Sequence, residues 1–97
     1  MYAQVSRVRL NEGATEKWIA LTRDSILPAA KEQKGFVCAY LLVDRTTNTG
    51  IGISLWETED DVVAVAESGF YQQQVAKIAP LLAEPPERRV YEVATQL

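Results

Sequence analysis

Apolar and polar positions change their spacing along the chain, and each change marks the boundary of an expected element. Residues 2–10 alternate loosely and are rich in β-branched and aromatic side chains, which favours a first strand. From Ala14 the apolar positions recur every three or four residues, which predicts a helix. Pro28 lies inside that pattern and has no amide hydrogen. We therefore expect a kink or a break between Asp24 and Leu27.

The middle of the chain predicts a β-hairpin. Residues 36–43 are apolar without interruption, and residues 51–58 alternate strictly between apolar and other side chains. The residues between them are of turn-forming types. In the second of these strands the alternation puts Gly52, Ser54 and Trp56 on one face.

A second helical region is expected from Thr58 or Glu59, where acidic side chains gather at the positive end of the helix dipole. Ser68 and Gly69 interrupt it, and helical spacing resumes at Phe70 and continues to about Leu82. Two prolines then stop the helix, and residues 88–97 predict a last strand. One face of that strand is expected to carry Tyr91, Val93, Thr95 and Leu97.

The expected order, β-α-β-β-α-β, is that of an α+β ferredoxin-like fold with a four-stranded antiparallel sheet and both helical regions on one face. An antiparallel strand with one wet face should alternate, but residues 36–43 do not. Something must therefore cover the second face of the sheet. The 97 residues fit a single domain, 1–97, with no third layer to offer. We expect a homodimer joined through the sheet faces.

Composition excludes several classes of function. A net charge of −3 argues against nucleic-acid binding, which needs a concentrated basic surface. No segment reaches the ~18 apolar residues that span a membrane, and the N-terminus has no apolar signal core, so we expect a cytoplasmic protein. The single cysteine, Cys38, lies among apolar residues and is interpreted as structural. The absence of histidine excludes a Ser-His-Asp triad, histidine-ligated haem and nearly every zinc site. We expect no cofactor and no metal.

Four segments resemble the antibiotic biosynthesis monooxygenase-like (ABM) domains of the dimeric α/β-barrel superfamily. They are KGFVCAYLLVD, GIGISLWETEDD, YQQQVAKIAPLLAEPP and the closing VYEV. The most specific pieces are Gly35-Phe36 and Leu55-Trp56-Glu57-Thr58. The resemblance implies a dimeric α/β barrel but not one activity, because the family includes cofactor-free monooxygenases, haem-degrading enzymes and many proteins without an established activity.

The haem-degrading branch carries Asn, Trp and His where this chain has Ser6, Trp56 and approximately Ala66. Only the tryptophan is kept, so the resemblance does not extend to haem turnover. The cofactor-free branch implies a different chemistry, in which the substrate enolate itself reduces dioxygen. The protein then supplies a dry cavity, orientation and hydrogen bonds to the developing oxyanion. Such a function needs no histidine.

We therefore expect a monooxygenase-like protein that acts on a small aromatic or polyketide-type compound in a cavity between sheet and helices. The candidate catalytic residues are Trp56, Tyr71 and Ser6, and the candidate ligand-binding residues are Tyr40, Ser54 and Gln4. Each also has an ordinary structural interpretation, such as core packing for Trp56, anchoring of the second helix for Tyr71 and strand surface for Ser6 and Gln4. The alternative function is a non-catalytic small-molecule binder or structural homodimer. A void of ~300 Å³ or more beside Trp56 would favour a ligand.

Overall fold

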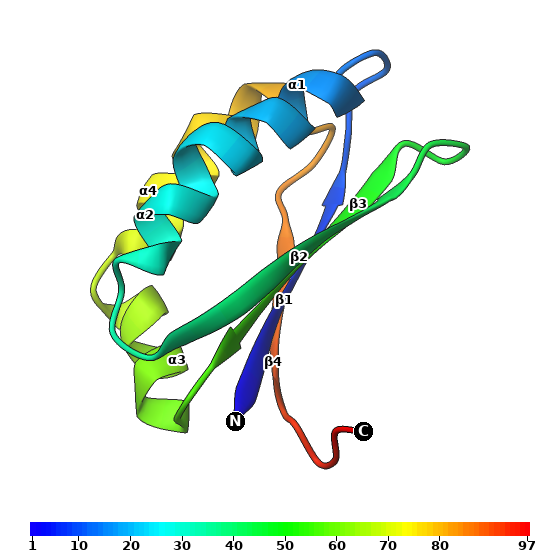
Figure 1. Cartoon of the computed structure of the whole chain (residues 1–97). Coiled ribbons are helices and arrows are strands. Elements are labelled where there is room, and N and C mark those ends of the chain that lie inside the picture. The colour runs from blue at the N-terminus through cyan, green and yellow to red at the C-terminus, as the bar shows by residue number, and fades with distance from the viewer.

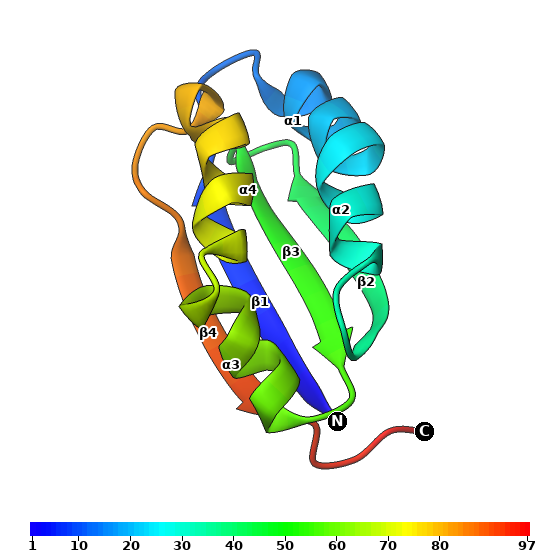
Figure 2. The ribbon, with the colours of Figure 1, turned by 90° about the vertical axis from the view of Figure 1, so that its left-hand side faces the viewer.

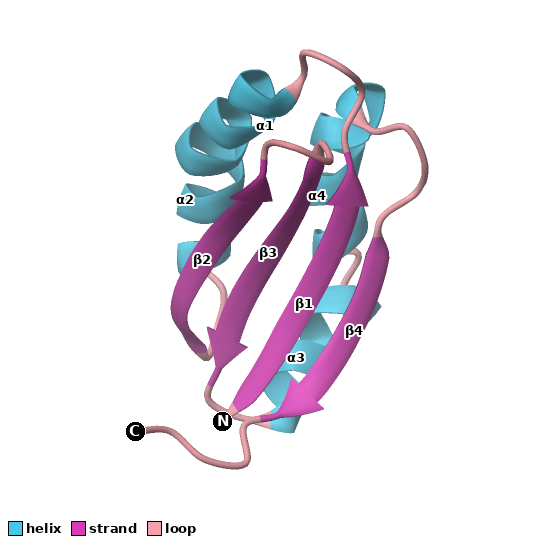
Figure 3. Ribbon diagram, turned by 90° about the vertical axis from the view of Figure 1, so that its right-hand side faces the viewer, coloured by secondary structure: helices cyan, strands magenta, loops and turns pink.

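A computed structural model describes residues 1–97 and has the expected order of elements (Figure 1). The four strands form one antiparallel sheet in the spatial order β2-β3-β1-β4. They are β1 (Tyr2–Arg9), β2 (Phe36–Asp44), β3 (Thr49–Trp56) and β4 (Glu87–Glu92). The α-helices α1 (Thr15–Leu21), α2 (Leu27–Lys31), α3 (Glu59–Glu67) and α4 (Phe70–Ile78) cover one face of the sheet (Figure 2). The other face carries no helix (Figure 3). The predicted α+β ferredoxin-like fold is confirmed.

The first helical region is irregular where Pro28 was expected to disturb it. A π-helical segment, Thr22–Ile26, joins α1 to α2, and the Leu27 N–H donates to the Thr22 carbonyl five residues back. Pro28 lies in the first turn of α2, where its missing amide hydrogen costs least. The chain therefore stays helical and widens instead of breaking.

The second helical region is interrupted at Gly69, as predicted. The Thr58 hydroxyl caps α3 by accepting a hydrogen bond from the Asp61 N–H at 3.1 Å. Gly69 has φ of +85° and separates α3 from α4. Glycine tolerates this left-handed backbone without strain. The break lets α4 take a new direction, and a short 3-10 turn, Ala79–Leu81, ends it.

The last strand is shorter than predicted. β4 ends at Glu92, so the expectation of a strand over 88–97 was wrong for the last five residues. The reason is the register: Glu92 pairs with Tyr2, the first residue of β1, and β1 is the only neighbour of β4. Beyond that pair only Met1 remains, and its carbonyl accepts one hydrogen bond from the Val93 N–H.

Two clusters of buried side chains form the core between the sheet and the helices. One contains Val8, Leu10, Trp18 and Ile78, and the other contains Trp56, Val62 and Val65. Trp18 is 2% exposed and packs directly on the backbone of Gly50. A Cβ added at Gly50 would lie 2.3 Å from Cη2 of Trp18, so this close approach requires glycine. Trp18 therefore belongs to the core.

The helices of this fold are short. None of them is long and apolar enough to cross a membrane.

Candidate functional site

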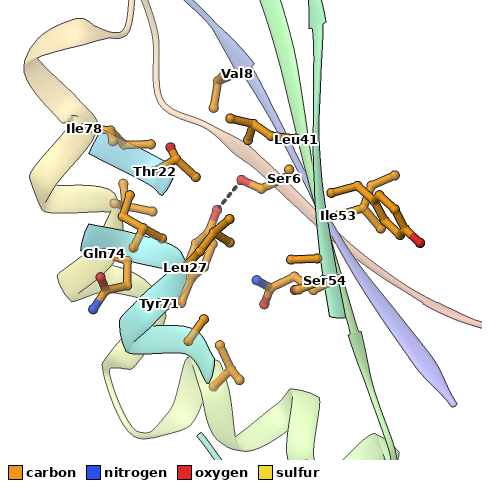
Figure 4. Close-up of a pocket in the computed structure, with 18 of the residues that line it drawn as sticks. Ser6, Val8, Thr22, Leu27, Leu41, Ile53, Ser54, Tyr71, Gln74 and Ile78 are labelled. Carbon is orange, nitrogen blue, oxygen red and sulfur yellow. Dashed lines mark hydrogen bonds between the residues drawn. The ribbon is translucent and has the colours of Figure 1, made fainter. Parts of the chain in front are cut away.

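A cavity of about 110 Å³ lies between the sheet and the helices (Figure 4). Its lining includes members of both core clusters, among them Trp18 and Trp56. Ala39 and Leu41 of the edge strand β2 line part of the sheet side, and most of the rest comes from inward positions of the two central strands. These are Gln4, Ser6 and Val8 on β1 and Gly52, Ser54 and Trp56 on β3. The antiparallel register pairs Gln4 with Ser54 and Ser6 with Gly52, which places these side chains next to one another.

Gly52 leaves the space that the cavity occupies. The nearest atom to a Cβ built on Gly52 is Cδ1 of Leu41 at 3.9 Å, whereas the same position on Gly50 is filled by Trp18. The small residues that share a face with Trp56 therefore leave room beside its ring. The volume is below the ~300 Å³ that is typical of ligand pockets. A cavity of ~150 Å³ in an apolar core holds one benzene ring. The volume is therefore nearer to that of a single ring.

A pair of hydroxyl groups forms a polar point on the cavity wall. Ser6 Oγ on β1 and Tyr71 Oη on α4 are joined by a hydrogen bond of 2.9 Å (Figure 4). Tyr71 follows the break at Gly69, and the new direction of α4 turns its phenol toward the sheet. The structure therefore brings together two of the predicted catalytic residues, from segments 65 positions apart in the sequence.

Trp56 packs in the core and also lines the cavity. It is 1% exposed, and its ring meets Phe36 edge to face at 5.6 Å between centroids. Its indole Nε1–H donates to Ser54 Oγ at 2.9 Å. Because this N–H is already used, Trp56 offers a ligand a flat apolar wall and no free hydrogen-bond donor. Its interpretation as a core residue is confirmed, whereas its contact with a ligand stays a prediction.

Arg88 on β4 contacts residues on one side of the site, and the sequence pattern did not indicate it. Its Nε donates to Gln4 Oε1 at 2.7 Å, and its Nη2 donates to the Val62 carbonyl at 3.1 Å. Its guanidinium carbon also lies 5.4 Å from the centre of the Tyr71 ring, within range of a cation–π contact. Arg88 faces the site because it pairs with Ser6 in the register between β4 and β1. This register cannot be read from the sequence alone.

Tyr40 belongs to the cavity lining, but its side chain lies largely on the outer face of the sheet, so a contact between its hydroxyl and a ligand stays a prediction. It pairs with Ile53 on the outer face of the sheet and is 58% exposed. Ile53 points away from the cavity in Figure 4. The cause is a bulge between Phe36 and Cys38, which shifts the alternation by one residue. After inward-facing Phe36 the next inward-facing residues are therefore Ala39 and Leu41, and Tyr40 turns outward.

Two buried polar atoms near the cavity have no hydrogen-bond partner. They are Thr22 Oγ1, on the π-helical segment, and Gln74 Oε1, on α4. Both residues line the cavity and are 6% and 8% exposed. Gln74 is the one glutamine of the Gln72–Gln74 run that turns inward, because Gln72 and Gln73 are exposed.

The charged groups with shifted pKa values lie on the surface. The pKa of Tyr2 is raised mainly by the charge of Glu59, then by partial burial and by Glu92. A hydrogen bond from Arg23 lowers the pKa of Asp24. These two residues form an exposed ion pair, so Arg23 is a solvated residue and not a ligand anchor.

Neither the protein-family models nor the curated protein sequences contain a match to this chain. Solved structures do. The ActVA-Orf6 monooxygenase of Streptomyces coelicolor, solved with the ligand nanaomycin D, is similar with a TM-score of 0.82 at 17% identity, over 99% of this chain and 89% of that one. SnoaB, a cofactor-independent oxygenase from Streptomyces nogalater, has a TM-score of 0.74 at 20% identity, over 99% of this chain and 95% of that one.

A protein of unknown function from Nitrosomonas europaea is similar as well, with a TM-score of 0.75 at 23% identity, over 99% of this chain and 92% of that one. These likenesses show that the chain has the fold of the ABM-like domains, as the sequence segments suggested. At such low identities they carry the fold and not the activity.

Proposed function

We propose that this protein binds a small aromatic compound in the cavity and catalyses its oxygenation by dioxygen without a cofactor. The observation that carries the proposal is the Ser6–Tyr71 hydroxyl pair on the wall of an otherwise mainly apolar cavity. A polar pair in such a place orients a ligand oxygen, and the apolar lining excludes water around it.

The two hydroxyl hydrogens of the Ser6–Tyr71 pair determine how many hydrogen bonds it can donate to a ligand. One of the two O–H groups is used in the bond between Ser6 and Tyr71, which leaves the other free to donate. A free O–H stabilises a phenolate or enolate oxygen on the ligand. The ionised ligand then gives electrons to dioxygen, one oxygen atom enters the ring and the other leaves as water. For phenol the balance is phenol plus O₂ giving benzoquinone plus water.

The other lining residues have supporting roles. Trp56 supplies a flat wall for a ring to stack on, and Ser54 fixes the indole orientation through its hydrogen bond. The amide oxygen of Gln4 is occupied by Arg88, so only the Gln4 NH₂ group is left to contact a ligand. The likeness to two named oxygenases supports this chemistry at the level of the fold.

A non-catalytic homodimer of the same fold is the second candidate, and the cavity volume favours it. About 110 Å³ is small for an enzyme of polycyclic compounds, and a core with a minor packing gap accounts for such a volume. The two candidates differ in whether a single-ring compound binds and consumes oxygen.

Oxygen consumption separates these candidates. The assay uses single-ring phenols and hydroquinones, with anthrones as larger members of the panel, and no added cofactor. We expect uptake with the single rings. Ser6→Ala and Tyr71→Phe should each raise the barrier by about 1–3 kcal/mol, which is roughly 5- to 150-fold in kcat. Tyr40→Phe removes the same hydroxyl from the outer face and is the matched control. If no compound of the panel causes oxygen uptake, the oxygenase proposal is refuted and the non-catalytic homodimer is favoured.

The homodimer is part of the same proposal. One face of the sheet carries no helix (Figure 3). Large apolar side chains are exposed on it, among them Tyr40, Leu42 and Tyr91, which are 58%, 47% and 52% exposed. Ile51 and Ile53 of β3 continue this surface through their pairing with Leu42 and Tyr40. A monomer rarely leaves such a contiguous apolar surface in water. A second copy covers it by symmetry.

Light scattering tests the assembly. The wild-type mass should be about twice 10.8 kDa at micromolar concentration. Leu42→Glu puts a charge on the outer sheet face and should give the single-chain mass. Val63→Glu is the matched control, because Val63 is similarly exposed, at 41%, but lies on α3. A wild-type mass that stays at 10.8 kDa at higher concentration refutes the dimer.

A further inference from the structure

We infer that the hydroxyl group of Thr22 is a second hydrogen-bonding contact for the ligand and selects compounds that carry a second oxygen. This inference rests on the proposed function, because it concerns the same cavity. The inference starts from a free-energy cost, which is that of a buried hydroxyl group without a hydrogen-bond partner. Thr22 Oγ1 is buried and has no partner, and such a group costs about 1–3 kcal/mol relative to a partnered one.

The local backbone explains why no partner is present and why one can be supplied. Thr22 opens the π-helical segment, and π segments are frequent at functional sites. Threonine in a helix adopts two side-chain rotamers, and rotation about χ1 between them moves the hydroxyl group to a different staggered position. The observed rotamer makes no hydrogen bond, so a change of rotamer loses none. The Thr22 side chain already lines the cavity.

The cavity then has two separate polar contacts. The Ser6–Tyr71 pair has one free O–H, and Thr22 adds a second O–H from a different helix. A single ring with one oxygen uses only the first contact. A ring with two oxygens uses both, because a hydroxyl substituent can accept the Thr22 O–H. The ligand class is therefore a single-ring aromatic compound with two oxygen substituents.

Gln74 provides an internal control. Its Oε1 is also buried and unpartnered, but its amide points away from the Ser6–Tyr71 bond in Figure 4. Thr22→Val and Gln74→Met each remove one buried polar atom that has no hydrogen-bond partner, and each leaves the side-chain volume nearly unchanged. Replacing an unpartnered polar group with an apolar group of similar shape is neutral or stabilising. Both variants should melt at or above the wild-type temperature.

Titration calorimetry without oxygen tests the inference with phenol and the three isomeric dihydroxybenzenes. We expect at least one isomer to bind wild type more tightly than phenol. Thr22→Val should weaken that isomer by roughly 3- to 10-fold, the value of one neutral hydrogen bond, and change phenol less than twofold. Thr22→Ser keeps the hydroxyl and should keep most of the preference, and Gln74→Met should keep all of it.

Each other outcome overturns the inference in a recognisable way. If no isomer exceeds phenol, or if Thr22→Val keeps the preference, Thr22 is not a ligand contact. If Thr22→Val lowers the melting temperature, its hydroxyl already has a partner such as a buried water, and the starting observation fails. If neither phenol nor any isomer binds wild type, the proposed function fails together with the inference.

Discussion

Gly50 and Gly52 are two residues apart on the same face of β3, yet they should respond in opposite ways to the addition of one methyl group. At Gly50 the new Cβ would lie 2.3, 2.5 and 3.1 Å from three atoms of the Trp18 ring. Ordinary contacts begin near 3.5 Å, so the ring must move by about 1 Å. At Gly52 the nearest atom is 3.9 Å away, and the methyl group fits.

The expected magnitude follows from the burial of Trp18. The ring is 2% exposed and belongs to the core cluster with Val8, Leu10 and Ile78. Forcing a packed core residue to move costs about 1–3 kcal/mol. For a domain of this length each kcal/mol lowers the melting temperature by about 4–8 °C. Gly52→Ala should be neutral or slightly stabilising, because alanine reduces the freedom of the unfolded chain.

Thermal unfolding followed by circular dichroism measures both variants. The same pair in a Trp56→Phe background leaves Trp18 as the only tryptophan, and its emission should change in Gly50→Ala alone. Gly52→Ala should instead weaken phenol binding, since its methyl group enters the cavity. Equal melting temperatures for the two variants would refute the packing described for Trp18.

Three further outcomes are expected. Gly35→Ala should be more destabilising in thermal melts than Gly13→Ala, because both positions have positive φ but only Gly35 faces Asp61, at 2.1 Å from the added Cβ. The raised pKa of Tyr2 adds stability that is complete below the usual tyrosine pKa and is lost as pH rises through the raised value. The absorbance difference between wild type and Tyr2→Phe should therefore titrate above the usual tyrosine range. Added haem should give no saturable Soret shift, because the chain has no histidine.

The order and type of the elements were predictable because each has a local cause. The acidic residues in the first turn of α3, the break at Gly69 and the strict alternation of β3 are all readable from neighbouring positions. The end of β4 was not predictable in this way. It depends on where β1 begins, which is a property of the register between two distant segments.

The site shows the same division between local and distant causes. Ser6, Ser54 and Trp56 lie on the faces that simple alternation assigns to them. The facing of Tyr40 could not be predicted, because residues 36–43 do not alternate and one inserted residue in β2 reverses every side chain after it. Arg88 was missed because its importance comes from Gln4 and Val62, which the chain brings near it only after folding.

The central position of β3 gives this small domain two independent mutable surfaces on one strand. Ile51, Ile53 and Leu55 face outward, whereas Gly52, Ser54 and Trp56 face the cavity. A substitution at 52 or 54 changes the size and polarity of the cavity and leaves the outward side chains as they are. Substitutions that alter the cavity and substitutions that alter the outer face of the sheet therefore fall on alternate residues of the same eight-residue strand. A library randomised at 52 and 54 alone would explore ligand preference while the outer face of the sheet stays constant.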